Sequence, residues 1–364
     1  MRRVALLAFV SLLSPPSALA QQAQQPVLEE FIAAYAEAHD FNGSILIQAG
    51  QQVRYAESFG FANLPFRVPN TRETRYKIAS VTKAFTAVLI LQLQEQGRVH
   101  LDRTIGAYLP DYAGPARDRV TIHQLLNHTS GIQNYEQITS FDEAVANGMP
   151  NYQLPHTTDQ LLARFSSGSL VHEPGTVFDY NNADYVILGK ILEQIYEQPY
   201  EQVLQERILG PLGLTGTGVV RQSEIVDGMA DTYFYREDLG RLANDLPVYL
   251  ENWYAAGAMY STPRDILAFA NALFGERLLR KETLARMITP GLDDYGYGVW
   301  SYETLIDGRS HRVVKRPGRI MGAQSQLYHI LDGDVTVVIL SNTGTTDLDE
   351  FVAAIGKLVI STGS

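Results

Sequence analysis

The sequence predicts a mixed α/β (α+β) fold, in which one sheet carries a helical region inserted between its two halves. The first observation is that segments with strand character gather near both ends of the chain, while the middle alternates between helical stretches and loops rich in Gly and Pro. The second is size, because 364 residues with 45% hydrophobic side chains can bury a core without covalent staples. Strands at both ends indicate that the two terminal parts of the chain build one sheet together.

The N-terminal part contains a helix, two strands and a longer helix. Apolar residues recur at helical spacing over residues 26–39, which predicts an amphipathic helix. Residues 43–48 and 53–59 are expected to be strands, joined by the turn at 49–51. The stretch from Ser80 to Gly97 is apolar on nearly every side, so it predicts a central, buried helix.

The rest of the chain is helical first and then returns to strands. Few segments between about 100 and 275 have strand character, and the helices expected there are 122–126, 158–165, 184–196, 200–208 and 263–273. The C-terminal strands are expected at 296–302, 312–316, 324–331 and 335–341, followed by a helix at 348–360. We therefore expect one domain over 21–364, whose α/β part covers about 26–99 and 276–362 and whose helical insert covers about 100–275.

The first twenty residues have the features of a secretory signal peptide. Arg2 and Arg3 form a charged start, Val4–Leu13 an apolar stretch too short to span a bilayer, and Ala18–Ala20 a small-residue cleavage site. A buried first strand is the alternative, but the preceding arginines and the following Gln-rich stretch disfavour it. We expect cleavage after Ala20, a secreted or periplasmic protein, and no membrane span.

Composition excludes several classes of function. The chain has no cysteine, so it has no disulfide, thiolate metal site or cysteine nucleophile. Its net charge of -11 would become -13 after removal of Arg2 and Arg3, which argues against nucleic acid or anionic lipid as a partner. His123 and His128 are five residues apart, the wrong spacing for two metal ligands on one helical face. We expect no metal and no organic cofactor.

Ser80-Val81-Thr82-Lys83 is the first candidate for catalysis. Residues three apart on a helix share a face, so the Ser80 hydroxyl and the Lys83 amine can come within hydrogen-bonding distance. A serine needs a neighbouring base to become a nucleophile. A partly buried lysine can be that base, because desolvation lowers its pKa. The tetrad alone is weak evidence.

Tyr180-Asn181-Asn182 is the second candidate. A phenol near a lysine can relay a proton between a nucleophile and a leaving group, and the Asn182 amide can hold a substrate carbonyl. The alternative is structural, because such a segment before a helix is often a packed ring and a helix cap.

A third candidate is the basic segment Lys315-Arg316-Pro317-Gly318-Arg319, at the end of an expected strand. Arg316 could bind a substrate carboxylate, and Gly318 would let the backbone approach a carbonyl. Pro317 has no N–H, so the strand must be an edge at that point. A solvated basic turn is the alternative.

Taken together, Ser80-x-x-Lys83, Tyr180-x-Asn182 and Arg316-x-Gly318 resemble the active-site motifs of the serine β-lactamase and penicillin-binding superfamily. The branch they resemble contains class C β-lactamases, D-alanyl-D-alanine carboxypeptidases and related esterases. Supporting stretches are 121–131, 174–180, 211–214, 256–262 and 297–300, so the resemblance covers roughly 28–360. The chain departs from the family at the third motif, where His or Lys is usual and Arg316-Pro317 stands here, and this puts substrate choice in doubt more than catalysis.

The resemblance implies a β-lactamase/transpeptidase-like fold, an antiparallel sheet flanked by helices plus an all-α insert, with the site in the cleft between them. It also implies that Ser80 forms an acyl-enzyme, that Lys83 takes the serine proton, and that Tyr180 passes this proton to the leaving group and then helps activate water. Which of the two is the true base stays open, and Asn182 would orient the substrate and the lysine. The backbone N–H groups of Ser80 and Arg319 would form the oxyanion hole.

For substrate and reaction we expect hydrolysis of a peptide-like amide or ester, of the D,D-carboxypeptidase or β-lactamase type. An esterase or acyltransferase acting on small esters is one alternative, and a penicillin-binding protein that acylates without turnover is another. The sequence leaves the oligomeric state open.

Overall fold

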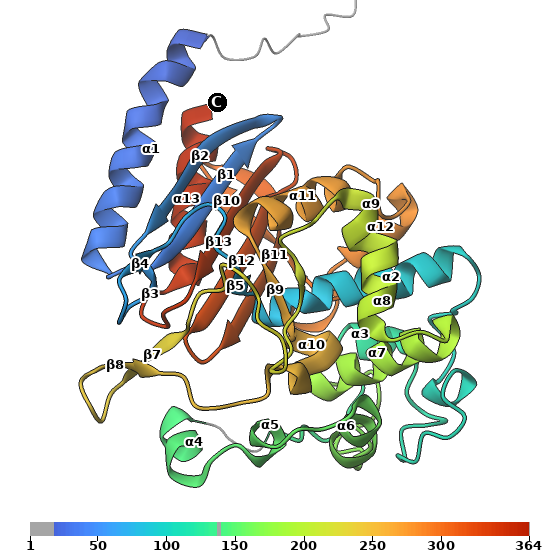
Figure 1. Cartoon of the computed structure of the whole chain (residues 1–364). Coiled ribbons are helices and arrows are strands. Elements are labelled where there is room, and N and C mark those ends of the chain that lie inside the picture. Colours follow the sequence, from blue (N-terminus) through green and yellow to red (C-terminus); the bar gives the residue numbers. More distant parts are fainter. Residues whose placement is uncertain (1–17, 137–139, 364) are drawn as a thin grey trace, which may run out of the picture.

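A six-stranded antiparallel sheet organises the molecule, a computed structural model that describes residues 18–136 and 140–363 (Figure 1). Its strand order is β10-β11-β12-β13-β1-β2, with bounds Trp300–Ile306, Arg309–Ile320, Ala323–Ile330, Val335–Ser341, Gly43–Ala49 and Gln52–Phe59. The two ends of the chain meet where β1 pairs with β13, from Gly43 opposite Ser341 to Ala49 opposite Val335. This confirms the α/β fold class and the sheet assembled from both terminal parts.

One expected strand is displaced by a glycine. Residues 296–302 were expected to be extended, but β10 begins only at Trp300. Gly298 has a φ of +75°, a left-handed conformation that turns the chain instead of extending it. A Cβ at this position would lie 2.9 Å from the Lys83 carbonyl oxygen, so the turn also packs closely against the central helix.

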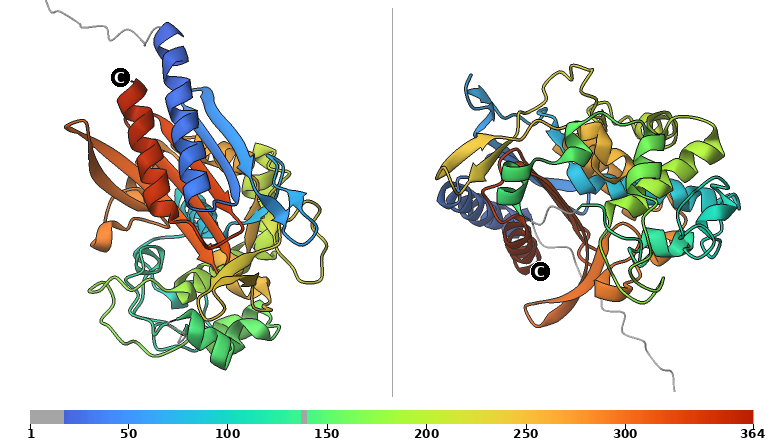
Figure 2. Two further views of the ribbon diagram at one scale, coloured as in Figure 1. Left: turned by 90° about the vertical axis from the view of Figure 1, so that its left-hand side faces the viewer. Right: turned by 90° about the horizontal axis from the view of Figure 1, so that it is seen from below.

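Two terminal helices, α1 (Ala18–Ala38) and α13 (Leu348–Gly363), lie side by side on one face of the sheet (Figure 2). Their apolar sides share one buried cluster with the strands, which includes Ile32, Ile339 and Phe351. The rings of Tyr35 and Phe351 stack with centroids 4.1 Å apart. The predicted first helix is thus confirmed, although it begins before residue 26.

The opposite face is covered by α2 (Thr82–Glu95) and α11 (Pro263–Phe274). The rings of Phe85 and Phe269 stack at 3.7 Å between these two helices. The side chains of α2 are buried from Thr82 through Leu91, which confirms that this helix is central. Because α11 packs on β1 and β13, it belongs to the sheet, which corrects the expected insert boundary at 275.

The remaining helices are α3 (Ile122–Leu126), α4 (Phe141–Asn147), α5 (Pro150–Gln153), α6 (Thr158–Phe165), α7 (Asn182–Tyr196), α8 (Tyr200–Leu204), α9 (Gly210–Leu212), α10 (Tyr254–Gly257) and α12 (Lys281–Met287). Of these, α7 and α10 pack against α2, and α4, α5 and α6 lie farther from the sheet (Figure 1). Capping boxes set the start of two of them, because Thr121 and Thr157 each accept a backbone N–H bond from a glutamine three residues later. After Leu204 the chain continues as a wider π-type turn over Gln205–Leu209.

Short strands also occur where few were expected. They are β3 (Phe61–Asn63), β4 (Val68–Pro69), β5 (Tyr76–Lys77), β6 (Gly218–Val219), β7 (Tyr233–Arg236), β8 (Arg241–Asn244) and β9 (Met259–Ser261). Four of them lie in the expected insert, so its all-α description is wrong. Strands of two to four residues give almost no periodic signal, and their partners are distant in sequence.

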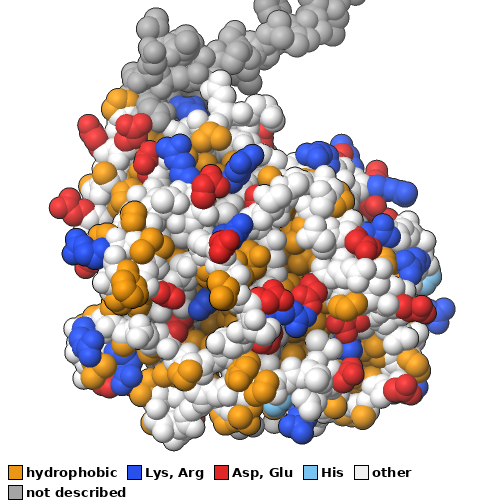
Figure 3. Space-filling view, viewed as in Figure 1, with side chains coloured by type: hydrophobic (Ala, Val, Ile, Leu, Met, Phe, Trp, Pro, Cys, Tyr) orange, Lys and Arg blue, Asp and Glu red, His pale blue; other side chains and the backbone are white. Residues whose placement is uncertain are grey.

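Residues 1–17 of the expected signal peptide lie outside the described residues, and Ala18–Ala20 form the start of α1. Within 18–136 and 140–363, every helix is too short or too polar to cross a membrane. Acidic and basic side chains are interspersed over the face of the molecule seen in Figure 3.

Candidate active site

Ser80 sits in a tight turn between β5 and α2. Ala79, the residue before it, has a φ of +47°, a left-handed conformation that costs a non-glycine residue about 1–2 kcal/mol. The 3-10 turn Ala79–Val81 then leads into α2, and the Thr82 hydroxyl donates to the Ala79 carbonyl at 2.7 Å. The nucleophile candidate is therefore held just ahead of the helix, by backbone that the surrounding core keeps strained.

The Ser80 hydroxyl oxygen accepts two hydrogen bonds. The Lys83 Nζ donates from 3.2 Å and the Tyr180 hydroxyl from 2.9 Å. The first contact is the one that the three-residue spacing predicted. The second joins segments that are far apart in the sequence.

Lys83 is fully buried and all three of its N–H bonds are used. Besides Ser80, the ammonium donates to Asn182 Oδ1 at 2.6 Å and to the Ala256 carbonyl at 2.9 Å. Burial, helped by the nearby charge of Arg316 and opposed by Tyr180, lowers the pKa of Lys83 to about 8. When charged, this lysine is a donor with no free lone pair.

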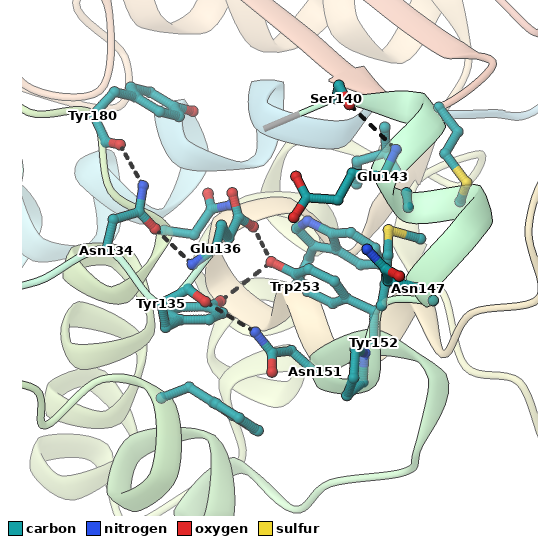
Figure 4. Close-up of a pocket in the computed structure, with 18 of the residues that line it drawn as sticks. Asn134, Tyr135, Glu136, Ser140, Glu143, Asn147, Asn151, Tyr152, Tyr180 and Trp253 are labelled. Carbon is teal, nitrogen blue, oxygen red and sulfur yellow. Dashed lines mark hydrogen bonds between the residues drawn. The ribbon is translucent and has the colours of Figure 1, made fainter. Parts of the chain in front are cut away.

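Tyr180 lies in the segment before α7, and the Asn134 side chain donates to its carbonyl at 3.4 Å (Figure 4). Burial alone raises the pKa of the Tyr180 phenol. The positive charges of Arg316 and Lys83 outweigh burial and hold that pKa below its usual value. Tyr180 can therefore lose its proton more easily than an ordinary tyrosine.

Arg316 faces inward, which does not fit its expected role as a carboxylate binder. The side chain is 1% exposed. Its Nε donates to the Ser80 carbonyl at 2.6 Å, its Nη1 to the Tyr295 hydroxyl at 2.9 Å and its Nη2 to the Tyr180 hydroxyl. The guanidinium is thus directed at phenols and backbone of the site.

The segment Arg316–Ile320 is a local edge of the sheet. Pairing with β10 ends at Trp300 opposite Lys315, so Pro317 pairs only with Gln326 of β12. This confirms the edge that Pro317 predicted. The unpaired side of β11 faces the turn that holds Ser80.

Gly318 lets β11 approach that turn. A Cβ there would lie 2.4 Å from the Ile78 carbonyl oxygen and 2.9 Å from the Ser80 nitrogen. The Ser325 hydroxyl donates to the same Ile78 carbonyl at 2.7 Å and ties β12 to the turn. The expected oxyanion donors, the N–H groups of Ser80 and Arg319, therefore belong to two segments in close contact.

Sequence reasoning missed Glu136. The Asn182 side chain, which holds Lys83 through its oxygen, donates through its nitrogen to Glu136 Oε1 at 2.7 Å. The Tyr152 hydroxyl donates to the same carboxylate oxygen (Figure 4). Glu136 lies in a loop with no periodicity and no motif spacing to the tetrad, so nothing local distinguishes it.

A buried His128–Asp184 pair packs against the Tyr180 segment. The His128 Nδ1 and Asp184 Oδ2 atoms are 2.9 Å apart, and the His128 ring centroid is 4.4 Å from that of Tyr180. Burial lowers the pKa of His128 well below its usual value and raises that of Asp184. Within the described part of the chain, no cluster of three or more His, Asp or Glu side chains is arranged to hold a metal ion.

Two cavities flank Ser80 and Tyr180. The helical-side cavity, about 820 Å³, is lined by residues that include Asn134, Glu136, Tyr152, Asn182 and Trp253 (Figure 4). The sheet-side cavity, about 560 Å³, is lined by residues that include Pro317, Arg319, Gln324, Gln326 and Thr345. Arg319 also lines both cavities, so a substrate whose carbonyl lies at Ser80 can extend into either of them.

Comparisons with known proteins found similar sequences and similar solved structures. The family model described as Beta-lactamase matches residues 28–360. A penicillin-binding protein of Bacillus subtilis is 27% identical over 88% of this chain and 72% of its own. The solved structure of a penicillin-binding protein from Bacillus halodurans has a TM-score of 0.77 and 30% identity, and covers 90% of this chain and 98% of that one. D-amino acid amidase from Ochrobactrum anthropi SV3 has a TM-score of 0.75 and 25% identity, with 95% and 98% covered.

Proposed function

The chain belongs to the beta-lactamase family of serine hydrolases, and on that premise we propose that it cleaves amide or ester bonds through an acyl-enzyme on Ser80. The observation that carries this proposal is the pair of hydrogen bonds on the Ser80 hydroxyl, from Lys83 at 3.2 Å and Tyr180 at 2.9 Å. Burial lowers the pKa of Lys83, and the adjacent positive charges of Arg316 and Lys83 lower the pKa of Tyr180.

In the acylation step the Tyr180 phenolate takes the Ser80 proton as Oγ bonds to the substrate carbonyl carbon. We favour Tyr180 over Lys83 as the base, because all three N–H groups of the lysine donate hydrogen bonds. The charge of the lysine also lowers the pKa of the Tyr180 phenol. The N–H groups of Ser80 and Arg319 stabilise the oxyanion. Tyr180 then passes the proton to the leaving nitrogen or oxygen as its bond to the carbonyl carbon breaks.

In the deacylation step water replaces the leaving group. Tyr180 takes a proton from the water, whose oxygen attacks the acyl carbon, and returns a proton to Ser80 as the ester bond breaks. An alcohol or amine in place of water would make the same site an acyltransferase.

The substrate we propose is peptide-like, of the D,D-carboxypeptidase or β-lactamase type, and the protein acts after export. Penicillin-binding relatives support the substrate class, and the signal-like N-terminal sequence supports export. An esterase and a penicillin-binding protein without turnover remain the rival functions.

Intact-mass analysis of the mature protein with benzylpenicillin tests the acyl-enzyme. We expect an adduct on the wild type and none on Ser80→Ala. A D-Ala-D-Ala peptide and a p-nitrophenyl ester, assayed in parallel, rank peptidase against esterase. A stable adduct without product would identify the non-turnover protein, and full activity of Ser80→Ala on every substrate would refute the mechanism.

Glu136 favours a second candidate, an amidase for substrates with a free ammonium on the acyl side. Its carboxylate lines the helical-side cavity, with one oxygen held by Asn182 and Tyr152, and no described residue donates to the other. An amino acid amide, the substrate class that the name of D-amino acid amidase states, has such an ammonium.

The test compares D-alanine p-nitroanilide with its N-acetyl derivative. We expect Glu136→Gln to lower kcat/KM for the free-amine substrate by about ten-fold or more, the value of a charge-assisted hydrogen bond, and to spare the acetylated one. An equal loss on both would show that Glu136 only holds Asn182 in place.

A further inference from the structure

A third cavity, of about 630 Å³, lies between β5 and the base of the hairpin formed by β7 and β8. No residue of the described chain lines both this cavity and one of the two cavities at Ser80. The Tyr76 hydroxyl shares a hydrogen bond of 2.8 Å with the Ser44 hydroxyl in the core. Because side chains alternate along a strand, the next residue, Lys77, points the other way and lines the third cavity.

The Lys77 amine is shielded but has few partners. Its Nζ donates to the Thr232 hydroxyl at 2.8 Å, and it makes no further hydrogen bond or ion pair with any residue that the structure describes. By contrast, Lys83 uses all three of its N–H groups, and the Lys315 Nζ lies 2.6 Å from Asp349 Oδ1. The Lys77 amine is therefore positioned by one neutral hydroxyl and is otherwise open to the cavity.

This amine favours its neutral form. Burial lowers the pKa of Lys77, although the carboxylates of Asp245 and Asp231 oppose the shift. A larger share of the amine is then unprotonated at neutral pH, and the unprotonated amine is the nucleophilic form.

Asp245 lies beside the same threonine. Its backbone N–H donates to the Thr232 carbonyl at 3.2 Å, and its Oδ1 accepts the Gly322 N–H at 2.9 Å. Burial raises the pKa of this carboxyl, against a hydrogen bond from Thr232 and the charge of Lys77. The cavity thus holds a carboxyl that keeps its proton readily and an amine that loses its own readily.

The walls of the cavity indicate a neutral, hydroxylated ligand. The amide side chains of Gln153, Gln222 and Asn244 line it, and amides both donate to hydroxyl groups and accept from them. Asp231 also lines the cavity, and its negative charge disfavours an anion.

We propose that this cavity binds a small hydroxyaldehyde and that the Lys77 amine captures it as an imine. The amine nitrogen bonds to the aldehyde carbon, and one N–H proton moves to the carbonyl oxygen. The Asp245 carboxyl then protonates the resulting hydroxyl, which leaves as water, and takes up the second N–H proton as the C=N bond forms. The reaction does not involve Ser80, so this inference is independent of the proposed acyl-enzyme function.

Reductive trapping tests the proposal. The full chain is incubated at neutral pH with glycolaldehyde and sodium cyanoborohydride, which reduces an imine to a stable secondary amine, and peptide mapping by mass spectrometry gives the rate at each lysine. We expect Lys77 to be labelled at least about ten-fold faster than the exposed Lys281 and Lys357. A rate at Lys77 no higher than at these two lysines would overturn the proposal. Glyoxylate, an anionic aldehyde, should show a smaller preference for Lys77, and a larger one would refute the neutral class of ligand.

Asp245→Asn tests the proton donor, with acetic anhydride as a second reagent that acylates an amine without any dehydration step. We expect this variant to slow capture of glycolaldehyde at Lys77 by about ten-fold or more. Acetylation of Lys77 should be no slower, because loss of the Asp245 charge lowers the pKa of the amine further. The matched control Asp231→Asn removes a carboxylate from the same cavity and should slow neither reaction. Equal slowing of both reactions in Asp245→Asn would show that Asp245 only shapes the cavity and would overturn its role as the acid.

Discussion

Replacement of Arg316 tests whether this residue acts on Tyr180 or on the substrate. In Arg316→Met the charge is lost while the length of the buried side chain is roughly kept. The guanidinium carbon is 5.4 Å from the centre of the Tyr180 ring. At this 5.4 Å separation and an effective dielectric constant of about 20, the attraction for a phenolate is about 3 kcal/mol, or about 2 pKa units.

The sign follows from the charge. Arg316 favours the phenolate, so its removal raises the pKa of Tyr180. The acid limb of the kcat/KM profile should move to higher pH by up to about 2 units, which is a loss of about 100-fold at any pH below both pKa values. Arg316 also lowers the pKa of Lys83, so the limb moves in the same direction whichever residue is the base.

The assay is the pH dependence of kcat/KM for a neutral phenyl ester at constant ionic strength, with circular dichroism as the check on folding. Arg316→Lys, which keeps a positive charge at this position, should recover most of the shift. The reasoning would be refuted if Arg316→Met kept the wild-type pH profile on the neutral ester and lost activity only on substrates with a carboxylate. Arg316 would then be the carboxylate binder that the sequence suggested.

Three further substitutions test the packing and the proton transfer. Gly318→Ala places a Cβ 2.4 Å from the Ile78 carbonyl, and the resulting shift should slow acylation by about 100-fold; a wild-type rate would contradict the close approach. Lys83→Met should slow acylation by about 10²- to 10⁴-fold and raise the pKa of Tyr180, which the pH profile of kcat/KM would detect. Unchanged kinetics would exclude the lysine from proton transfer. Phe85→Ala should cost about 3–5 kcal/mol in the free energy of unfolding by urea, and a loss below about 1 kcal/mol would mean that the central helix repacks.

Much of the fold was predictable because its signals are local. The strands at 43–48 and 335–341 and the helices at 122–126 and 158–165 have clear periodicity or caps, and the structure contains them with nearly the same bounds. The strands of the insert could not be predicted in the same way. β9, for example, has three residues and is stabilised by partners from both β5 and β6, which no window of sequence contains.

The site likewise has one part that local sequence predicts and another that depends on distant segments. Ser80 and Lys83 are three residues apart, and helical geometry alone brings their side chains together, so the sequence by itself determined this contact. The surroundings of Arg316 and Arg319 on β11 were decided only by the tertiary structure. Strand alternation shows that Arg316 and Arg319 point to opposite faces, but which face holds Tyr180 depends on how distant segments pack. Tertiary packing therefore placed the Arg316 guanidinium against the Tyr180 phenol and left Arg319 exposed.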